Sequence, residues 1–312
     1  MNIAILGATS QIAKDLILSA SKVGNYAMTL FARRPEDVNI WLSAVGLLNR
    51  YKAFNFDSFK SSRHFDGVIN FVGVGNPAQA TILGSGILDI TYFYDSLVLN
   101  YLVKNPYCKY IFLSSGAAYG TNFQQPVDQD SQAIININNL QPHDWYGMAK
   151  LNAECRHRAL PNFSIVDIRV FNYFSHSQDM ESRFLITDIV RAIRDDTLLE
   201  TSSGYMVRDF LNPIDFYQLV TKIFNASPAN DQVDCYTLAP VEKLELLDSI
   251  ASQFGLRYKI CSSSRGINAT GEKPCYYSLN RSAEKFGYNP KFSSIEGVIH
   301  EIDAYTKFMP RR

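Results

Sequence analysis

Three side chains near the middle of the sequence have types and a spacing suited to moving a proton. Ser115 ends an apolar segment, and Tyr146 and Lys150 stand at positions i and i+4. A phenol has a pKa of about 10, so it is a poor acid or base at neutral pH unless a nearby ammonium lowers that pKa. We therefore expect Lys150 to lower the pKa of Tyr146, which moves the proton while the Ser115 hydroxyl holds the substrate oxygen.

The elements around these residues are expected to bring them together. Residues 110–113 are apolar and partly β-branched, which predicts a buried strand that delivers Ser115 to the edge of a sheet. Residues 145–154 have a helical pattern, and their spacing places Tyr146 and Lys150 on one helix face. The alternative is an amphipathic helix on which the tyrosine packs and the lysine reaches solvent. Motifs elsewhere in the chain are needed to distinguish a catalytic pair from an ordinary amphipathic helix.

The N-terminal residues predict a strand, a tight turn and a helix that could bind a dinucleotide. Residues 3–6 are apolar, and Gly7 permits the turn. The free N–H groups and the dipole at the start of such a helix attract a pyrophosphate. A dinucleotide fingerprint usually has three glycines, but Ser10 and Ala13 occupy the second and third places, so an ordinary strand-to-helix turn is the alternative. The expected contacts in this turn are Gly7, Thr9, Ser10, Gln11 and Ile12.

Two arginines after the second predicted strand favour a phosphorylated dinucleotide. Arg33 and Arg34 stand where an acidic residue would bind a ribose 2′-hydroxyl. A guanidinium binds phosphate through two hydrogen bonds, so we expect NADP(H) in preference to NAD(H), with a solvated pair of charges as the alternative. After the third strand, Asp57 is either an adenine contact or an exposed loop carboxylate. After the fourth strand, Gly73 lets the backbone approach a ligand.

Composition excludes several classes of protein. The 312 residues suit one large α/β unit with an appended lobe, and 46% of them are hydrophobic. The 30 basic and 30 acidic residues balance, so neither a nucleic-acid partner nor a membrane surface is expected. Five scattered cysteines and five histidines show no metal-ligand spacing, so we expect no metal site. The N-terminus lacks a signal-peptide pattern, which predicts a cytoplasmic protein.

The chain resembles the extended short-chain dehydrogenase/reductase family, often called NAD-dependent epimerase/dehydratase proteins. Strands alternating with helices predict the parallel sheet of such a fold. The motifs that carry the resemblance follow the family's order along nearly the whole chain. They are Gly7-x-x-Ser10-x-x-Ala13, the strand 111–115 with Ala118-Tyr119-Gly120 after it, Tyr146-x-x-x-Lys150, Arg169-Val170-Phe171-Asn172, Val207-Arg208-Asp209-Phe210 and Phe286-Gly287-Tyr288-Asn289-Pro290.

The resemblance implies an α/β fold: a Rossmann-type, doubly wound parallel sheet that binds NAD(P), with a smaller C-terminal substrate lobe for a nucleotide sugar. The first domain would be residues 1–171, rejoined by about 208–239 through a strand at 234–238, and the lobe would be 172–312. A homodimer through helices flanking the sheet is compatible with the resemblance. A turn-rich segment, 262–275, is expected to be a mobile loop near the sugar.

The resemblance also assigns roles to individual residues. Ser115 and Tyr146 would be catalytic, and Lys150 would also bind the nicotinamide ribose. Phe171 would lie near the nicotinamide, or else in the core. The sugar nucleotide's diphosphate would be bound by Asn172 and Arg208, with Arg183 as a further phosphate contact. The alternatives are a turn former for Asn172, an ion pair with Asp209 for Arg208 and a solvated helix surface for Arg183.

Three functions fit these expectations. The first is an NADPH-dependent reductase of a nucleotide-diphosphate-linked 4-keto-6-deoxy sugar, and the second is a sugar-nucleotide epimerase that uses the same residues. The third is a non-catalytic NADP-binding sensor, suggested by Ser10 in the phosphate turn. The family's 4,6-dehydratases usually carry Thr-Asp-Glu at the active-site strand end, where this chain has Ser115-Gly116-Ala117, so dehydration is not expected.

Overall fold

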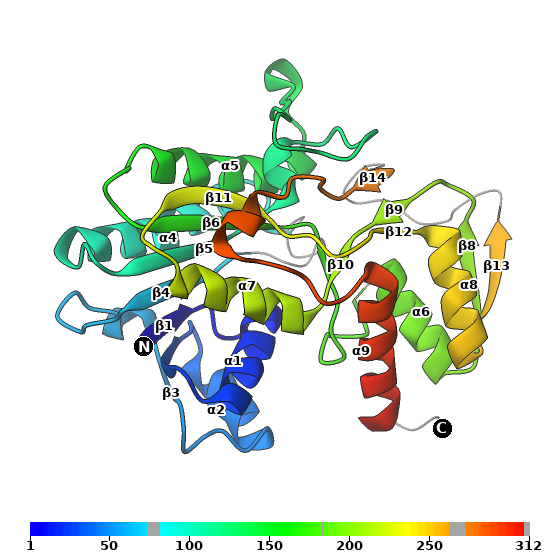
Figure 1. Ribbon diagram of the computed structural model, residues 1–312, viewed down its shortest axis with the longest axis horizontal. Coiled ribbons are helices and arrows are strands. Elements are labelled where there is room, and N and C mark those ends of the chain that lie inside the picture. Colours follow the sequence, from blue (N-terminus) through cyan, green and yellow to red (C-terminus); the bar gives the residue numbers. More distant parts are fainter. Residues whose placement is uncertain (74–81, 183, 262–272, 309–312) are drawn as a thin grey trace.

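A seven-stranded parallel sheet forms the centre of the computed structural model, which describes residues 1–73, 82–182, 184–261 and 273–308 (Figure 1). Its strand order is β11-β6-β5-β4-β1-β2-β3, with the order reversing on either side of β1. The predicted α/β Rossmann-type class is therefore confirmed. The strands are β1 (Asn2–Leu6), β2 (Ala27–Phe31), β3 (Lys52–Phe54), β4 (Gly67–Asn70), β5 (Lys109–Ser115), β6 (Ile165–Val170) and β11 (Asn230–Asp234).

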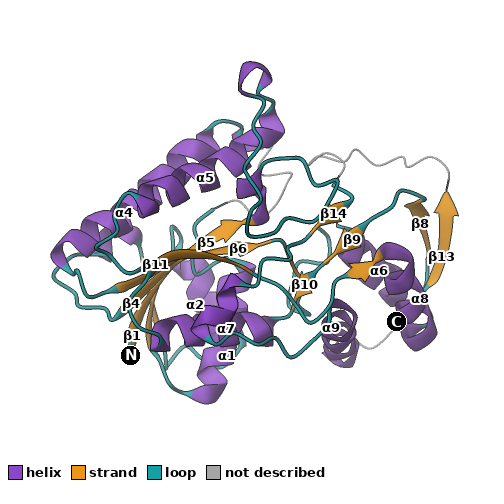
Figure 2. Cartoon of the chain, turned by 45° about the horizontal axis from the view of Figure 1, so that its top comes forward, coloured by secondary structure: helices purple, strands orange, loops and turns teal. Residues whose placement is uncertain are grey.

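Helices cover both faces of this sheet (Figure 2). The strands are buried on both sides, and β1 shows how: Ile3 and Ile5 join the core beneath one set of helices, whereas Ala4 and Leu6 join the core beneath the other. The first set is α1 (Gln11–Val23), α2 (Pro35–Ala44) and α7 (Pro213–Asn225). The second set is α4 (Gly86–Lys104) and α5 (Trp145–Arg158).

The C-terminal part builds a second apolar cluster beside the sheet. Three helices supply most of it: α6 (Leu185–Arg194), α8 (Lys243–Phe254) and α9 (Ser294–Phe308). Three small sheets, with the orders β10-β7, β12-β9-β14 and β13-β8, accompany these helices. Their strands are β7 (Asn172–Tyr173), β8 (Leu198–Ser202), β9 (Val207–Arg208), β10 (Phe210–Leu211), β12 (Val241–Glu242), β13 (Arg257–Cys261) and β14 (Cys275–Tyr276).

The strand predicted at 234–238 is displaced along the sequence. The observed strand, β11, is Asn230–Asp234, and it pairs in parallel with β6 at the edge of the main sheet. The first three residues of β11 are polar and only half-buried, so they lack the hydrophobic pattern of a strand. The predicted strand therefore fell on the buried residues Cys235 and Tyr236, which follow β11. Among the helices of the described residues, none is long and apolar enough to cross a membrane.

Candidate active site

The turn between β1 and α1 has the backbone that a dinucleotide site needs. Gly7 has a φ of +79°, and a Cβ there would lie 2.9 Å from backbone atoms of Phe71 and Val72, so only glycine fits. At the start of α1, Ser10 makes no side-chain cap, and the first helical turn contains no acidic residue. The N–H groups of this turn therefore have neither a capping side chain nor a local carboxylate to compete with an anionic ligand. Thr9 is exposed beside them.

The other predicted residues of the turn have different surroundings. Ser10 has an extended backbone, with φ −61° and ψ 141°, which any residue adopts, so the missing glycine does not strain the turn. Gln11 uses its side-chain amide to bind Ser177 and, at 3.2 Å, Asp15 of α1. Ile12 packs against the main core.

Arg33 and Arg34, which follow β2, are both exposed but have different partners. The Arg34 Nε atom lies 2.7 Å from Asp37 in the first turn of α2, so its charge is partly used within its own loop. Arg33 makes no ion pair with any residue that the structure describes, so it is the better placed of the two for a phosphate. Asp57 is exposed in a short 3₁₀ segment, Phe56–Ser58.

Ser115 and Tyr146 come together where β5 ends and α5 begins. Ser115 ends β5, and its Oγ accepts a hydrogen bond of 3.2 Å from the Ala117 N–H. A Cβ on Gly147 would lie 2.5 Å from the Ala117 carbonyl oxygen, so this glycine allows α5 to approach the strand end. Burial raises the pKa of Tyr146, and a hydrogen bond with the Ser115 side chain acts in the opposite direction. The phenol is therefore protonated at neutral pH.

Lys150 lies one helical turn after Tyr146 on α5, and its amine reaches the end of β5. Its side chain is buried, and Nζ donates a 2.7 Å hydrogen bond to the Leu113 carbonyl oxygen. The same Nζ is 5.8 Å from the centre of the Tyr146 ring, and a Cβ on Gly73 would come within 3.3 Å of it. Burial lowers the pKa of Lys150 to about 8, although the Glu154 carboxylate opposes the change. The prediction that Lys150 lowers the pKa of Tyr146 is wrong for this structure, because burial of the phenol dominates.

Phe171 lies at the end of β6 against the loop that carries Ser115. A Cβ on Gly116 would lie 2.4 Å from the Phe171 ring, so this ring fits only over a glycine. The ring also packs against Tyr276, with 5.2 Å between ring centres, and belongs to a small aromatic cluster with Phe123. Phe171 is thus a core residue of the site region, next to the serine.

Asn172 and Arg208 both hold the segment that contains Tyr276. The Asn172 Nδ2 atom donates a 3.0 Å hydrogen bond to the Tyr276 carbonyl oxygen. The Arg208 guanidinium donates 2.7 and 3.2 Å bonds to the carbonyl oxygens of Lys273 and Pro274. Burial lowers the pKa of Arg208 to about 10. Both residues therefore have local structural contacts in addition to any ligand contact.

Arg208 does not form the alternative ion pair with its neighbour Asp209. The Asp209 carboxylate instead accepts bonds from the Thr237 N–H at 3.0 Å and the Ser294 hydroxyl at 2.9 Å. Across the described residues, the hydrogen bonds of the Arg208 guanidinium go to carbonyl oxygens, and no ion pair with a carboxylate occurs. Its positive charge is thus left for an anionic ligand.

The predicted phosphate contact of Arg183 and most of the predicted mobile loop, 262–275, cannot be compared with the structure. Arg183 lies outside the described residues, as do residues 262–272 of the predicted mobile loop. At the end of that loop, Cys275 is buried and begins β14, which pairs in parallel with β9, so the loop prediction is wrong at this residue. Two described backbone neighbours hold it in place: the Phe123 carbonyl accepts its N–H at 2.9 Å, and Val207 stands opposite it in the strand pair.

Two residues of the candidate site, Tyr276 and Lys273, were not predicted from the sequence. The Tyr276 hydroxyl is 3.4 Å from the Ser115 Oγ, so a second phenol reaches the candidate catalytic serine. The Lys273 Nζ atom lies 4.7 Å from the centre of the Tyr276 ring, and burial lowers its pKa to about 8. Lys273 lies within the turn-rich segment 262–275 and Tyr276 directly follows it, more than 150 positions from Ser115, and no local motif marks either residue. Of the residues described, no group of three or more His, Cys, Asp or Glu side chains could hold a metal ion.

Comparison with solved structures places the whole chain in one fold. UDP-glucuronic acid 4-epimerase from Bacillus cereus, in complex with UDP-glucuronic acid and NAD, has a TM-score of 0.78 at 18% identity, covering 99% of this chain and 100% of that one. UDP-glucose 4-epimerase from Thermotoga maritima gives 0.76 at 17%, covering 99% of each chain. dTDP-glucose 4,6-dehydratase from Bacillus anthracis, in complex with NAD, gives 0.77 at 15%, covering 98% and 97%.

Comparison of sequences identifies the family. No curated protein matches the sequence significantly. The profile described as "NAD dependent epimerase/dehydratase family" matches residues 3–238, which include the dinucleotide turn, Ser115, Tyr146, Lys150 and Arg208. The chain therefore belongs to the NAD dependent epimerase/dehydratase family, and it is an enzyme of the extended short-chain dehydrogenase/reductase type.

Proposed function

We propose that the protein is an NADPH-dependent reductase of a nucleotide-diphosphate-linked 4-keto-6-deoxy sugar. The observation that carries the proposal is the meeting of Ser115 and Tyr146 at the end of β5, with Lys150 buried behind them. A hydroxyl and a protonated phenol on one oxygen are what reduction of a carbonyl requires from the protein.

The chain's own residues have distinct roles in this proposal. The bound dinucleotide supplies a hydride to the carbonyl carbon. Ser115 holds the carbonyl oxygen, and Tyr146 donates the proton that neutralises the developing alkoxide. The raised pKa of Tyr146 keeps the phenol protonated, which is the form that a reductase needs. Lys150 places a positive charge behind the phenol and is available to the ribose of the dinucleotide, near Gly73.

Several features support a phosphorylated dinucleotide. The start of α1 has no capping side chain, and Gly7 brings the turn close to the strand end of β4, so the backbone fits a pyrophosphate. Arg33 is exposed and, among the described residues, has no carboxylate partner, so it is free to bind a 2′-phosphate. Arg34 shares its charge with Asp37 and contributes less. Asp57 stays a candidate for the adenine.

The substrate's diphosphate is proposed to bind near Arg208. Its guanidinium is partly buried and bonded to carbonyl oxygens, and among the described residues no carboxylate pairs with its charge. Lys273 adds a second cation, since its amine packs on the Tyr276 ring, to which Arg208 is also close. Asn172 would contact the same diphosphate by exchanging its bond to the Tyr276 carbonyl. Phe171 would border the nicotinamide, and Arg183 stays a prediction of the sequence.

An epimerase is the second candidate, because the chain shares its fold with two sugar-nucleotide 4-epimerases, one of them with NAD bound. An epimerase would use the same three residues and return the hydride to the other face of the sugar. It would keep its dinucleotide during purification and show no net change in the redox state of the dinucleotide during turnover. The division into residues 1–171 and 172–312, a homodimer and a cytoplasmic location also stay predictions of the sequence.

A panel assay separates these functions. Purified protein is mixed with NADPH, or with NADH, and a set of keto-sugar nucleotides and UDP-hexoses. The loss of absorbance of the reduced dinucleotide is followed, and the sugar products are identified. The reductase proposal predicts oxidation of NADPH with at least one keto sugar, and slower oxidation of NADH. If no dinucleotide is oxidised while a UDP-hexose is converted to its C4 epimer, the reductase proposal is wrong and the epimerase is right.

A further inference from the structure

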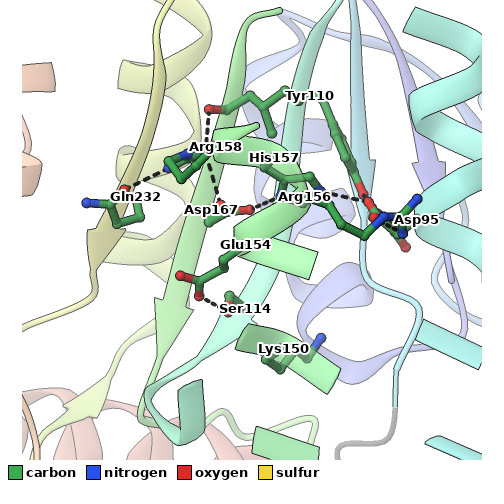
Figure 3. A network of polar contacts seen from close by, with 12 residues as sticks. Asp95, Tyr110, Ser114, Lys150, Glu154, Arg156, His157, Arg158, Asp167 and Gln232 are labelled. Atoms are coloured by element: carbon green, nitrogen blue, oxygen red, sulfur yellow. Dashed lines mark hydrogen bonds and ion pairs between the residues drawn. The ribbon is translucent and has the colours of Figure 1, made fainter. Parts of the chain in front are cut away.

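The face of α5 that packs on the sheet is unusually polar. Its buried residues include Lys150, Glu154 and His157, which stand at spacings of four and three and so point the same way. Figure 3 shows these side chains on α5, with Glu154 and His157 joined to polar partners. A helix that covers a sheet normally presents an apolar stripe, so this arrangement of charges calls for a specific explanation.

His157 is completely buried between two carboxylates. Its Nε2 atom lies 2.7 Å from Asp95 Oδ1, and its Nδ1 atom lies 2.6 Å from Asp167 Oδ1. A carboxylate only accepts hydrogen bonds, so both ring nitrogens carry a proton and the ring is an imidazolium. Burial acts to lower the pKa of His157, but Asp167 and Asp95 outweigh it and raise that pKa to about 9.

The two carboxylates anchor His157 to three other elements. Asp95 belongs to α4 and also accepts bonds from the Arg156 guanidinium at 2.7 Å and the Tyr110 hydroxyl of β5 at 3.0 Å. Asp167 belongs to β6, and the Arg158 guanidinium lies 3.1 Å from its other oxygen. We call His157, Asp95 and Asp167 the histidine clamp. It ties α5 to α4 and to the neighbouring strands β5 and β6 (Figure 3).

The histidine clamp is separated from Lys150 by one aromatic ring. The Phe112 ring of β5 has the Lys150 Nζ atom 4.5 Å from its centre and the His157 ring centre 5.2 Å away. Asp95 and Asp167, together with Glu154, favour the charged form of Lys150 against its burial. Glu154 is itself held by Arg169, at 2.5 Å, and by the Ser114 hydroxyl. The charge of Lys150 therefore depends on the balance of this buried cluster.

We propose that His157 is a positioning residue for the proposed reaction: through Asp95 and Asp167 it fixes α5 on the sheet and sets the net charge that Lys150 faces. The inference rests on the proposed role of Lys150. A histidine that served only to fill space would affect stability alone. Replacing a positioning histidine also shifts the pKa of Lys150. The charges of His157 and of its two carboxylates are separated from Lys150 only by the Phe112 ring, so removing one of them changes the electrostatic potential at the amine.

The signs of the effects follow from these charges. Asp167→Asn removes a negative charge, so the titration of Lys150 should move to lower pH by about one unit. His157→Gln removes a positive charge, so the titration should move to higher pH by about the same amount. In the double variant the two changes offset each other, and Lys150 should titrate close to its original pH. Asp95→Asn is a second removal of negative charge and should act like Asp167→Asn.

The titration of Lys150 is measured in the full-length protein by NMR with isotope-labelled lysine, and Lys150→Arg assigns its signal. This measurement needs no substrate. In parallel, the alkaline limb of the pH profile of kcat/KM is recorded with NADPH and the keto sugar that the panel assay identifies. His176→Gln is the matched control, because His176 forms a similar 2.6 Å pair with Glu301 of α9, away from α5. It should leave the titration of Lys150 unchanged.

Opposite shifts in the two single variants, with recovery in the double variant, support the proposal. Variants that lose thermal stability but leave the Lys150 titration in place would overturn it and leave His157 a structural residue. If His157→Gln does not fold, an unchanged titration in Asp95→Asn and Asp167→Asn overturns it equally. A shifted Lys150 titration without turnover of any sugar nucleotide would instead count against the proposed function.

Discussion

Replacing Lys150 with methionine should stabilise the folded protein and abolish its activity. Methionine has a similar length and no charge, so it fits the same buried space between β5 and α5. The wild-type amine is costly there, because burial lowers its pKa from 10.5 to about 8. The lysine is thus kept at the expense of stability, which is what we expect of a functional residue.

The size of the effect follows from the difference between the two pKa values. At about 1.4 kcal/mol for each pH unit, the difference between 10.5 and about 8 amounts to about 3 kcal/mol. Below about pH 8, Lys150 is protonated in both the folded and the unfolded state, so the folded state bears this cost in full. Methionine removes the cost but also the hydrogen bond to Leu113, worth about 1 kcal/mol. The net gain at neutral pH is about 2 kcal/mol.

The assay is urea unfolding of both proteins at a series of pH values. Between about pH 8 and about pH 10.5 the folded wild-type lysine loses its proton first, so the wild type gains stability and the advantage of the variant disappears. Lys52→Met, an exposed lysine of β3, is the control and should change neither stability nor its pH dependence. A Lys150→Met variant that is less stable at neutral pH, or whose difference from wild type does not depend on pH, would refute the reasoning.

Three further substitutions test the dinucleotide site and its borders. Arg33→Ala should weaken NADPH binding about 10- to 100-fold by calorimetry and leave NADH binding unchanged. Arg34→Ala should weaken NADPH binding less, because Arg34 pairs with Asp37. Equal losses of affinity for both dinucleotides in Arg33→Ala would contradict the NADP proposal. Gly7→Ala should abolish dinucleotide binding and cost at least about 1–2 kcal/mol of unfolding free energy, because its φ is +79° and the new Cβ meets backbone. Gly116→Ala should displace the Phe171 ring, lower turnover and reduce the free energy of unfolding by about 1–3 kcal/mol. Gly86→Ala is its control, because a Cβ at Gly86 would meet open space. Normal turnover in Gly116→Ala would argue against a role for the Phe171 ring.

Local patterns were enough to predict much of the site. The hydrophobic strand ending in Ser115 and the i, i+4 pair Tyr146 and Lys150 each depend on a few adjacent residues, and the fold of the family explains why they meet. The parallel sheet could likewise be predicted from strands alternating with helices. The turn at Gly7 was predicted from the sequence, and its requirement for glycine is visible in the contact with the backbone after β4.

Features that depend on distant residues could not be predicted. Tyr276 reaches Ser115 from 161 positions away, after a segment whose turn-forming residues predicted only a loop. His157 binds Asp95 from 62 positions away, and a lone histidine on a helix gives no sign of a buried carboxylate partner. The direction of the Tyr146 pKa was wrong for the same reason. Spacing indicates which charges are near a group, but the extent of its burial is a property of the whole fold.

The most direct test of the proposed chemistry is the rate of a single turnover in Tyr146→Phe. Enzyme with bound NADPH is mixed with excess keto-sugar nucleotide, and oxidation of the dinucleotide is followed by stopped flow, with NADPH affinity measured separately. Loss of the proton donor should slow oxidation by about 100- to 10,000-fold and leave NADPH affinity intact. An unchanged rate in this variant would contradict the assignment of Tyr146 as the group that delivers the proton.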